Sequence, residues 1–228
     1  MDARRTETTI PTSGVWLPAD LLAPPRSTGF VLFAHGSGSS RRSPRNVAVA
    51  GALAEHGLTA VLVDLLTAEE EVVDLRTAEL RFDIPLLAGR LSGIVDWLAE
   101  GNGGQPSPIG LFGASTGAAA ALVAAAARSR AVAAVVSRGG RPDLAGAELT
   151  RVRAPTLLLV GGLDREVLEL NERALRSLSG RAELRVVPGA SHLFEEPGTL
   201  EEVARHAAGW FGGHLAAPIP ESTTRTRP

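Results

Sequence analysis

One serine in this chain has the surroundings that nucleophilic chemistry requires. Residues 113–117 have the sequence Gly-Ala-Ser-Thr-Gly, the pattern G-x-S-x-G, between a predicted strand ending at Phe112 and a predicted helix starting at Thr116. A serine on such a sharp turn presents its hydroxyl at the edge of a sheet, and small neighbours let strand and helix pass closely. The N-terminus of the helix also directs free amides toward a developing oxyanion. We therefore predict that Ser115 is a nucleophile, the alternative being a strand–helix turn with an incidental serine.

A serine hydroxyl is a weak nucleophile without a base, so a histidine must lie within reach. Of the five histidines, His192 lies in a loop directly after the last predicted strand. Loops at the C-terminal ends of parallel strands meet at one edge of the sheet, where the serine turn also lies. His56 ends a predicted helix, which suggests a structural role. His206 and His214 fall on the last predicted helix or at its end, where we expect them to be solvated.

A carboxylate must orient the base, and Asp164 follows a short apolar strand directly. The chain order Ser115, Asp164, His192 is the order found in hydrolases that carry this serine turn. Asp143 is a competing candidate, because it also follows a predicted strand at one remove. Glu166 is expected in the first turn of the next helix, where acids are common.

The loop at residues 35–40, after the first apolar strand, is rich in glycine and serine and is expected to complete an oxyanion hole. We assign this role to the backbone amides of Ser37 and Thr116, with Gly36 beside the substrate. His35 is expected to fix the loop, a second base being the alternative. A rival interpretation takes the glycines and arginines of this loop as a phosphate cradle. The loop lacks both the spacing and the lysine of a phosphate-binding P-loop.

The elements that must position these residues follow an alternating pattern. Apolar runs of strand length, without period-two alternation, alternate with helical patterns through most of the chain. This pattern predicts an α/β fold with a mostly parallel central sheet and helices on both faces. The predicted strands are 29–34, 59–64, 108–112, 131–136, 156–160 and 183–187, and the predicted helices are 44–56, 81–100, 116–128, 166–178 and 200–211. Residues 15–17 suggest an antiparallel edge hairpin. We expect one domain over residues 1–214 and a disordered tail over 215–228.

Composition narrows the function classes. The net charge of −2 gives no reason to expect nucleic acid or an anionic membrane as a partner. The absence of cysteine excludes disulfides and a thiolate nucleophile and fits a reducing compartment. The N-terminal residues do not resemble a signal peptide, so we expect a cytoplasmic protein. Glu69, Glu70 and Glu71 are expected to form a solvated acidic turn, and no metal or cofactor is expected.

The loop at residues 35–46, the segments 64–67 and 113–117, and the stretch Val-Pro-Gly-Ala-Ser-His-Leu-Phe-Glu at 187–195 together resemble the dienelactone-hydrolase-like branch of the α/β-hydrolases. The resemblance covers roughly residues 10–214. It implies the α/β-hydrolase fold, a triad at Ser115, Asp164 and His192, and hydrolysis without a cofactor. Dienelactone hydrolases proper use a cysteine nucleophile, which this chain lacks. A serine esterase is therefore expected in place of the namesake reaction.

Only 19 residues separate the strands ending at Val136 and starting at Thr156, too few for a helical cap domain. An open site that accepts esters of small or exposed substrates is the consequence. Arg138 lies in this interval, and we hypothesise that it pairs with a carboxylate or phosphate of the substrate. The alternative is a surface arginine, or one bonded to a loop carbonyl. Thioester, lactone or amide hydrolysis by the same triad, a non-catalytic ligand-binding protein and a phosphate-binding regulator stay open, and the sequence does not indicate an oligomeric state.

Overall fold

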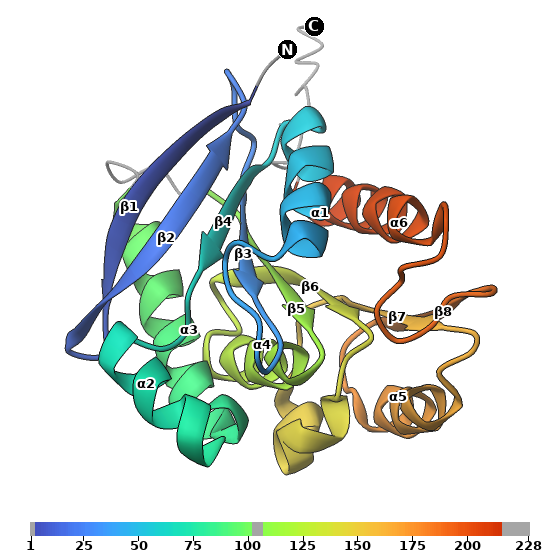
Figure 1. Cartoon of the computed structure of the whole chain (residues 1–228). Helices are drawn as coiled ribbons and strands as arrows, with labels where there is room; N and C mark the ends of the chain where they lie inside the picture. The colour runs from blue at the N-terminus through green and yellow to red at the C-terminus, as the bar shows by residue number, and fades with distance from the viewer. Residues whose placement is uncertain (1–2, 102–106, 216–228) are drawn as a thin grey trace, which may run out of the picture.

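The computed structural model describes residues 3–101 and 107–215, in which one eight-stranded sheet crosses the molecule (Figure 1). The strand order is β1-β2-β4-β3-β5-β6-β7-β8. The strands are β1 (Arg4–Thr12), β2 (Val15–Ala23), β3 (Phe30–Ala34), β4 (Thr59–Val63), β5 (Ile109–Ala114), β6 (Val132–Arg138), β7 (Thr156–Gly161) and β8 (Ala182–Val187). The hairpin β1–β2 is antiparallel and forms one edge, and β2 is also antiparallel to β4. The remaining strand pairs are parallel, which confirms the predicted sheet and edge hairpin.

Helices cover both faces of the sheet, as predicted (Figure 1). They are α1 (Pro44–Glu55), α2 (Ala68–Thr77), α3 (Ile84–Glu100), α4 (Thr116–Ala127), α5 (Arg165–Ser177) and α6 (Thr199–His214). Helices α1 and α6 pack together on one face, over Phe33 and Phe112. Helices α3 and α4 cover the other face, over Leu32 and Leu111. Adjacent residues of β3 and β5 therefore point into opposite cores, which explains why these strands read as continuous apolar runs.

Parallel pairing brings the C-terminal ends of the central strands to one level. Ala34 of β3 lies opposite Gly113 of β5, and Ala114 of β5 lies opposite Arg138 of β6. The loops that follow these strands therefore start side by side at one edge of the sheet. This edge is where ligands bind in open α/β sheets.

The predicted helix over 81–100 is wrong at its start, and the predicted acidic turn is a helix. Thr67 caps α2 with a capping box, in which the amide of Glu70 donates to Thr67 Oγ1 and Glu70 accepts from the amide of Thr67. Glu69, Glu70 and Glu71 form the first turn, where acids offset the helix dipole. A 3₁₀ turn, η1 (Leu80–Phe82), precedes α3, whose start is fixed by Asp83 accepting from the amide of Leu86 over 2.9 Å.

No large cap lies between β6 and β7, where the chain forms only the 3₁₀ stretch η2 (Pro142–Arg151). This confirms the prediction of an uncapped fold. The predicted disordered tail lies, except for Leu215, outside the described residues. Within residues 3–101 and 107–215, none of the helices has the length and apolar character needed to traverse a bilayer.

Candidate active site

Ser115 lies in the sharp turn between β5 and α4, in a strained backbone conformation with φ of 50° and ψ of −123°. A side chain at Gly117 would place its Cβ less than 3.0 Å from the carbonyl oxygens of Ala34 and His35. A Cβ at Gly113 would lie 2.7 Å from the amide nitrogen of Ala118. Both glycines are therefore required for the close passage of strand, turn and helix, as the motif predicts.

His192 and Asp164 lie in the loops that follow β8 and β7 and are joined by a short hydrogen bond. His192 Nδ1 donates to Asp164 Oδ2 over 2.6 Å, which leaves Nε2 as the proton acceptor of the ring. The side chain of His192 is 39% exposed and that of Asp164 is 14% exposed. The two loops are tied by the amide of Leu163, which donates to Ala190 O over 3.0 Å. The pair is thus fixed in place yet open on one side.

The competing carboxylates lie elsewhere. Asp143 lies in η2 and forms an ion pair with Arg141 at 2.7 Å. Glu166 is in the first turn of α5 and is exposed, as expected. Among the carboxylates of the described chain, Asp164 alone pairs with His192.

The backbone after β6 connects the serine turn to the histidine. The amide of Ser115 donates to Arg138 O over 3.2 Å, and a Cβ at Gly139 would lie 3.6 Å from His192 Cε1. Ser115 Oγ makes no hydrogen bond with His192 in residues 3–101 and 107–215. In structures without substrate such hydrogen bonds are often long or poorly aligned.

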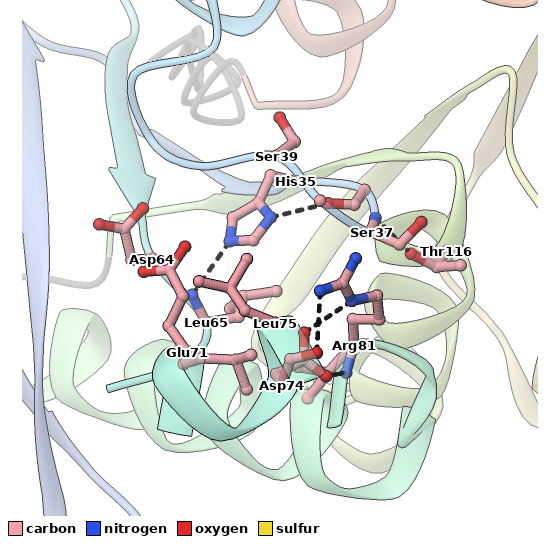
Figure 2. A pocket seen from close by; sticks show the side chains of 14 residues that line it. His35, Ser37, Ser39, Asp64, Leu65, Glu71, Asp74, Leu75, Arg81 and Thr116 are labelled. Carbon is pink, nitrogen blue, oxygen red and sulfur yellow. Dashed lines mark hydrogen bonds and ion pairs between the residues drawn. The ribbon is translucent and has the colours of Figure 1, made fainter. Parts of the chain in front are cut away.

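The loop after β3 packs directly against the serine turn. A Cβ at Gly36 would lie 3.0 Å from Ser115 Cβ and 3.2 Å from Ala114 O, so a larger residue there would press on the serine turn. The amide of Ser37, predicted to be free for an oxyanion, donates to Thr116 Oγ1 over 2.9 Å (Figure 2). The amide of Thr116 has no intrahelical acceptor, because α4 begins at this residue. The Thr116 hydroxyl therefore occupies the Ser37 amide in this structure.

His35 fixes this loop with both of its ring nitrogens. Nε2 accepts from the amide of Leu65 over 3.1 Å, and Nδ1 lies 3.0 Å from Gly36 O, to which it donates (Figure 2). Burial lowers the pKa of His35 below its ordinary value of 6.5, so the ring is neutral at pH 7. With both nitrogens engaged, His35 has no lone pair with which to act as a second base.

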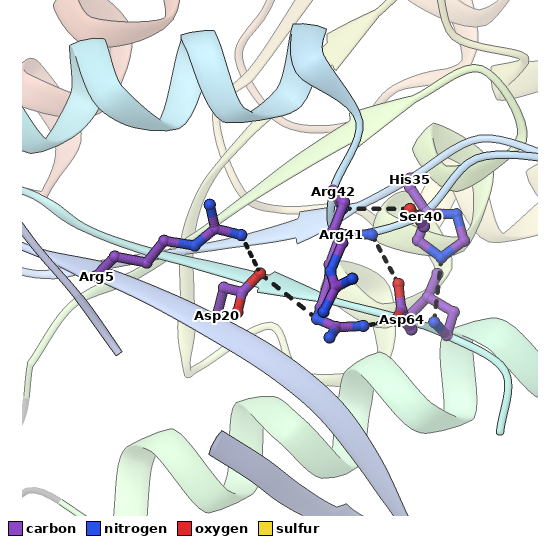
Figure 3. A network of polar contacts seen from close by, with 8 residues as sticks. Arg5, Asp20, His35, Ser40, Arg41, Arg42 and Asp64 are labelled. Atoms are coloured by element: carbon purple, nitrogen blue, oxygen red, sulfur yellow. Dashed lines mark hydrogen bonds and ion pairs between the residues drawn. The ribbon is translucent and has the colours of Figure 1, made fainter. Parts of the chain in front are cut away.

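A chain of ion pairs holds the same loop from the other side (Figure 3). The amide of Arg41 donates to Asp64 Oδ1 over 2.7 Å, and the Arg41 guanidinium pairs with both Asp64 and the fully buried Asp20. Arg5 of β1 pairs with the same Asp20 at 2.8 Å. The network links the edge hairpin to the loop that carries Ser37. Sequence reasoning missed it, because the pairing of β1 with β2 and of β2 with β4 brings the partners together.

A cavity of about 90 Å³ opens beside the serine turn (Figure 2). Its lining includes Ser37 and Thr116 on one side and residues of α2 on the other. Leu75 provides apolar surface, and Asp74 is held by Arg81 at 2.6 Å. Helix α2, absent from the sequence prediction, therefore forms one wall of the site. The signal for it was the sequence Thr-Ala-Glu-Glu at residues 67–70, a capping-box pattern.

The structure contradicts the alternative in which Arg138 is a surface arginine or is bonded to a loop carbonyl. Its side chain is buried, with the residue 7% exposed, and within the described residues no carbonyl or carboxylate accepts from its guanidinium. Burial, and then the charge of Arg45, lower the pKa of Arg138 to about 10.

The strand order and the serine turn with a histidine–aspartate pair at the same sheet edge define the class of α/β-hydrolases. The chain belongs to the dienelactone hydrolase family, whose model matches residues 21–211. A solved dienelactone hydrolase from Anabaena variabilis is 54% identical, with a TM-score of 0.91 over 94% of this chain and 100% of that chain. Est1E from Butyrivibrio proteoclasticus is 16% identical, with a TM-score of 0.76 over 92% and 99% of the two chains, a likeness of fold alone.

Two curated proteins of Mycobacterium tuberculosis strains are 57% identical over 200 residues and are named as phosphoribosyl transferases. The match covers 88% of this chain and 44% of each relative. This chain therefore spans less than half the length of those relatives.

Proposed function

We propose that this hydrolase cleaves carboxylic esters of small or exposed substrates, through an acyl-enzyme formed on Ser115. The observation that carries the proposal is the 2.6 Å pair of His192 and Asp164, located at the sheet edge where the strained serine turn lies. A carboxylate bound to Nδ1 fixes the tautomer in which Nε2 can accept a proton.

In the proposed mechanism, His192 Nε2 removes the Ser115 proton as Ser115 Oγ attacks the ester carbonyl. The amide of Thr116, and the amide of Ser37 once its contact with the Thr116 hydroxyl is exchanged, stabilise the tetrahedral oxyanion. The alcohol leaves with the proton from His192. Water then repeats the sequence on the acyl-enzyme, and Asp164 stabilises the imidazolium in both steps.

The cavity beside the serine turn, which Ser37 and Thr116 line but Ser115 and His192 do not, limits the size of an acyl group that extends toward α2. About 90 Å³ is well below the roughly 300–1,000 Å³ of sites that enclose drug-sized ligands. Without a cap, a larger alcohol portion can extend into solvent. The name carried by the mycobacterial relatives refers to longer chains, and we propose that a transferase activity belongs to their unmatched portion. Cytoplasmic location stays a prediction, based on the N-terminal sequence and consistent with the absence of cysteine.

The test is hydrolysis of nitrophenyl acetate by the wild type, by Ser115→Ala and by the matched control Ser177→Ala, which alters an exposed serine on α5. We expect the wild type and the control to release nitrophenol and Ser115→Ala to be inactive with an unchanged thermal midpoint. Turnover by Ser115→Ala at the wild-type rate would overturn the assignment. Absence of turnover in all three proteins would contradict ester hydrolysis as the function.

A further inference from the structure

Arg138 is a buried cation whose charge nothing in the described chain balances. Its Nη1 is inaccessible to solvent and has no hydrogen-bond partner in residues 3–101 and 107–215. The residue as a whole is 7% exposed. Burying a charge is costly unless it is paired, so native proteins place an acid beside such a group or use it to bind an anion.

A second arginine, Arg45 near the start of α1, adds to the unbalanced charge. Within the described parts of the chain, its Nε is also buried without a hydrogen-bond partner, and its one acidic contact is the exposed Glu195, 3.2 Å from Nη1. An exposed pair of this kind contributes little. Burial, and then the positive charge of Arg45, lower the pKa of Arg138 to about 10. Because Arg138 has no acidic partner in residues 3–101 and 107–215 and Arg45 has one exposed partner, the positive charge of the two arginines favours a bound anion.

The two arginines adjoin the candidate active site. Arg138 of β6 pairs with Ala114 of β5, the residue before the nucleophile, and the carbonyl of Arg138 accepts from the amide of Ser115. Arg45 lines an open depression of about 370 Å³ whose other charged residues are Arg42 and Glu71. This depression shares Gly38, Ser39 and Glu71 with the cavity beside the serine turn.

The N-terminus of α1 strengthens this preference for an anion. Helix α1 begins at Pro44, and the side chain of its N-cap residue Ser43 makes no capping hydrogen bond. The amides of Arg45 and Asn46 therefore have no intrahelical acceptor, an arrangement that favours anions.

We propose that Arg45 and Arg138 form a subsite for a dianionic phosphate group on the substrate, with Arg45 in contact with the phosphate and Arg138 behind it. The identification of the ligand as part of an ester substrate rests on the proposed function. Two guanidinium charges match a phosphate monoester, which carries about −1.5 to −2 at pH 7, better than a single carboxylate. Arg138 acts through the low-dielectric interior, where charges interact more strongly than in water.

Calorimetric titration of the whole chain with inorganic phosphate at constant ionic strength tests the subsite directly. We expect saturable binding by the wild type, and affinities lower by about tenfold in Arg45→Met and in Arg138→Met. Arg151→Met, which removes an exposed arginine paired with Glu148, is the matched control and is expected to bind as the wild type does. Acetate, a monoanion, is expected to bind more weakly than phosphate.

The thermal midpoint of Arg138→Met distinguishes a binding role of Arg138 from a purely structural one. If the guanidinium only supports the fold, Arg138→Met lowers the thermal midpoint, whereas removal of an unpaired buried cation leaves it equal or higher. Arg45 lies nearer the surface, so Arg45→Met keeps the binding test available if Arg138→Met fails to fold.

The subsite would be overturned if the wild type did not bind phosphate, if both methionine variants bound phosphate with the wild-type affinity, or if acetate bound more tightly than phosphate. The titration needs no turnover. Saturable phosphate binding by a chain that hydrolyses no ester would therefore contradict the proposed function and support the subsite.

Discussion

Gly117 is the position where the geometry of the candidate site depends most directly on a single missing side chain. It is the second residue of α4, and a Cβ there would lie 2.7 Å from the carbonyl carbon of Ala34. Ordinary contact begins at 3.4 Å, so the variant Gly117→Ala falls short by about 0.7 Å. Because the obstacle is backbone of β3 and its following loop, no side chain can rotate away to relieve it.

The size of the clash at residue 117 determines how much stability and how much kcat Gly117→Ala is expected to lose. Forcing an extra methyl into a packed interior costs about 1–3 kcal/mol of unfolding free energy. Relief of the clash must also separate the serine turn from the loop that carries Ser37. A displacement approaching 1 Å at reacting groups lowers the rate by about 10²-fold. We therefore expect Gly117→Ala to be less stable by about 1–3 kcal/mol and about 100-fold slower in kcat.

The assay pairs urea unfolding with hydrolysis of nitrophenyl acetate. The matched control is Gly51→Ala, a helix-interior glycine of α1 whose Cβ would meet nothing within 4 Å. This control is expected to gain about 0.5–1 kcal/mol and to keep the wild-type kcat. Wild-type stability and wild-type kcat in Gly117→Ala would refute the argument that the close passage of strand and helix positions the nucleophile.

Three further predictions concern residues around the turn. Asp164→Asn is expected to lower kcat by about 10⁴-fold, because the residue that holds His192 at 2.6 Å loses its charge. Asp143→Asn is expected to keep the wild-type kcat. Equal losses in the two variants would contradict the assignment of Asp164 as the acid that orients His192. Arg41→Met leaves the fully buried Asp20 with one partner and is expected to lower the free energy of unfolding in urea by about 3–5 kcal/mol. The control Arg128→Met removes an exposed pair and is expected to lower it by under about 1 kcal/mol. Similar losses in the two variants would contradict a stabilising role of the network. Because the pKa of His35 is lowered, the unfolded chain binds a proton below pH 6.5 that the folded chain does not bind, so the free energy of unfolding decreases as the pH is lowered, by at most about 1.4 kcal/mol per pH unit. We expect a shallower decrease in His35→Gln between pH 7 and pH 5. Identical slopes in the wild type and His35→Gln would contradict this role of His35.

The sequence predicted the parallel sheet and the residues at its C-terminal edge because those features depend on local patterns. Apolar runs of strand length mark buried parallel strands, and the glycines at 113 and 117 mark a sharp turn. Asp164 and His192 were selected by their position directly after strands, and the structure joins them by a hydrogen bond.

The features that sequence reasoning missed depend on contacts between distant segments. The hydrogen bond between the amide of Ser37 and the hydroxyl of Thr116 joins residues 79 positions apart. Arg138 is buried at the end of β6, and no local pattern in the sequence indicates this burial. Helix α2 is different, since its capping box is present in the sequence, although the run of three acids alone also fits a solvated turn.

The central claim is that Ser115 forms the acyl-enzyme, and covalent labelling tests it most directly. The whole chain would be treated with a fluorophosphonate ester, which modifies activated serines, and the adduct located by mass spectrometry of its peptides. We expect one adduct, on Ser115, with labelling slowed strongly in His192→Ala. An adduct on another serine, or equal labelling rates in the wild type and His192→Ala, would contradict it.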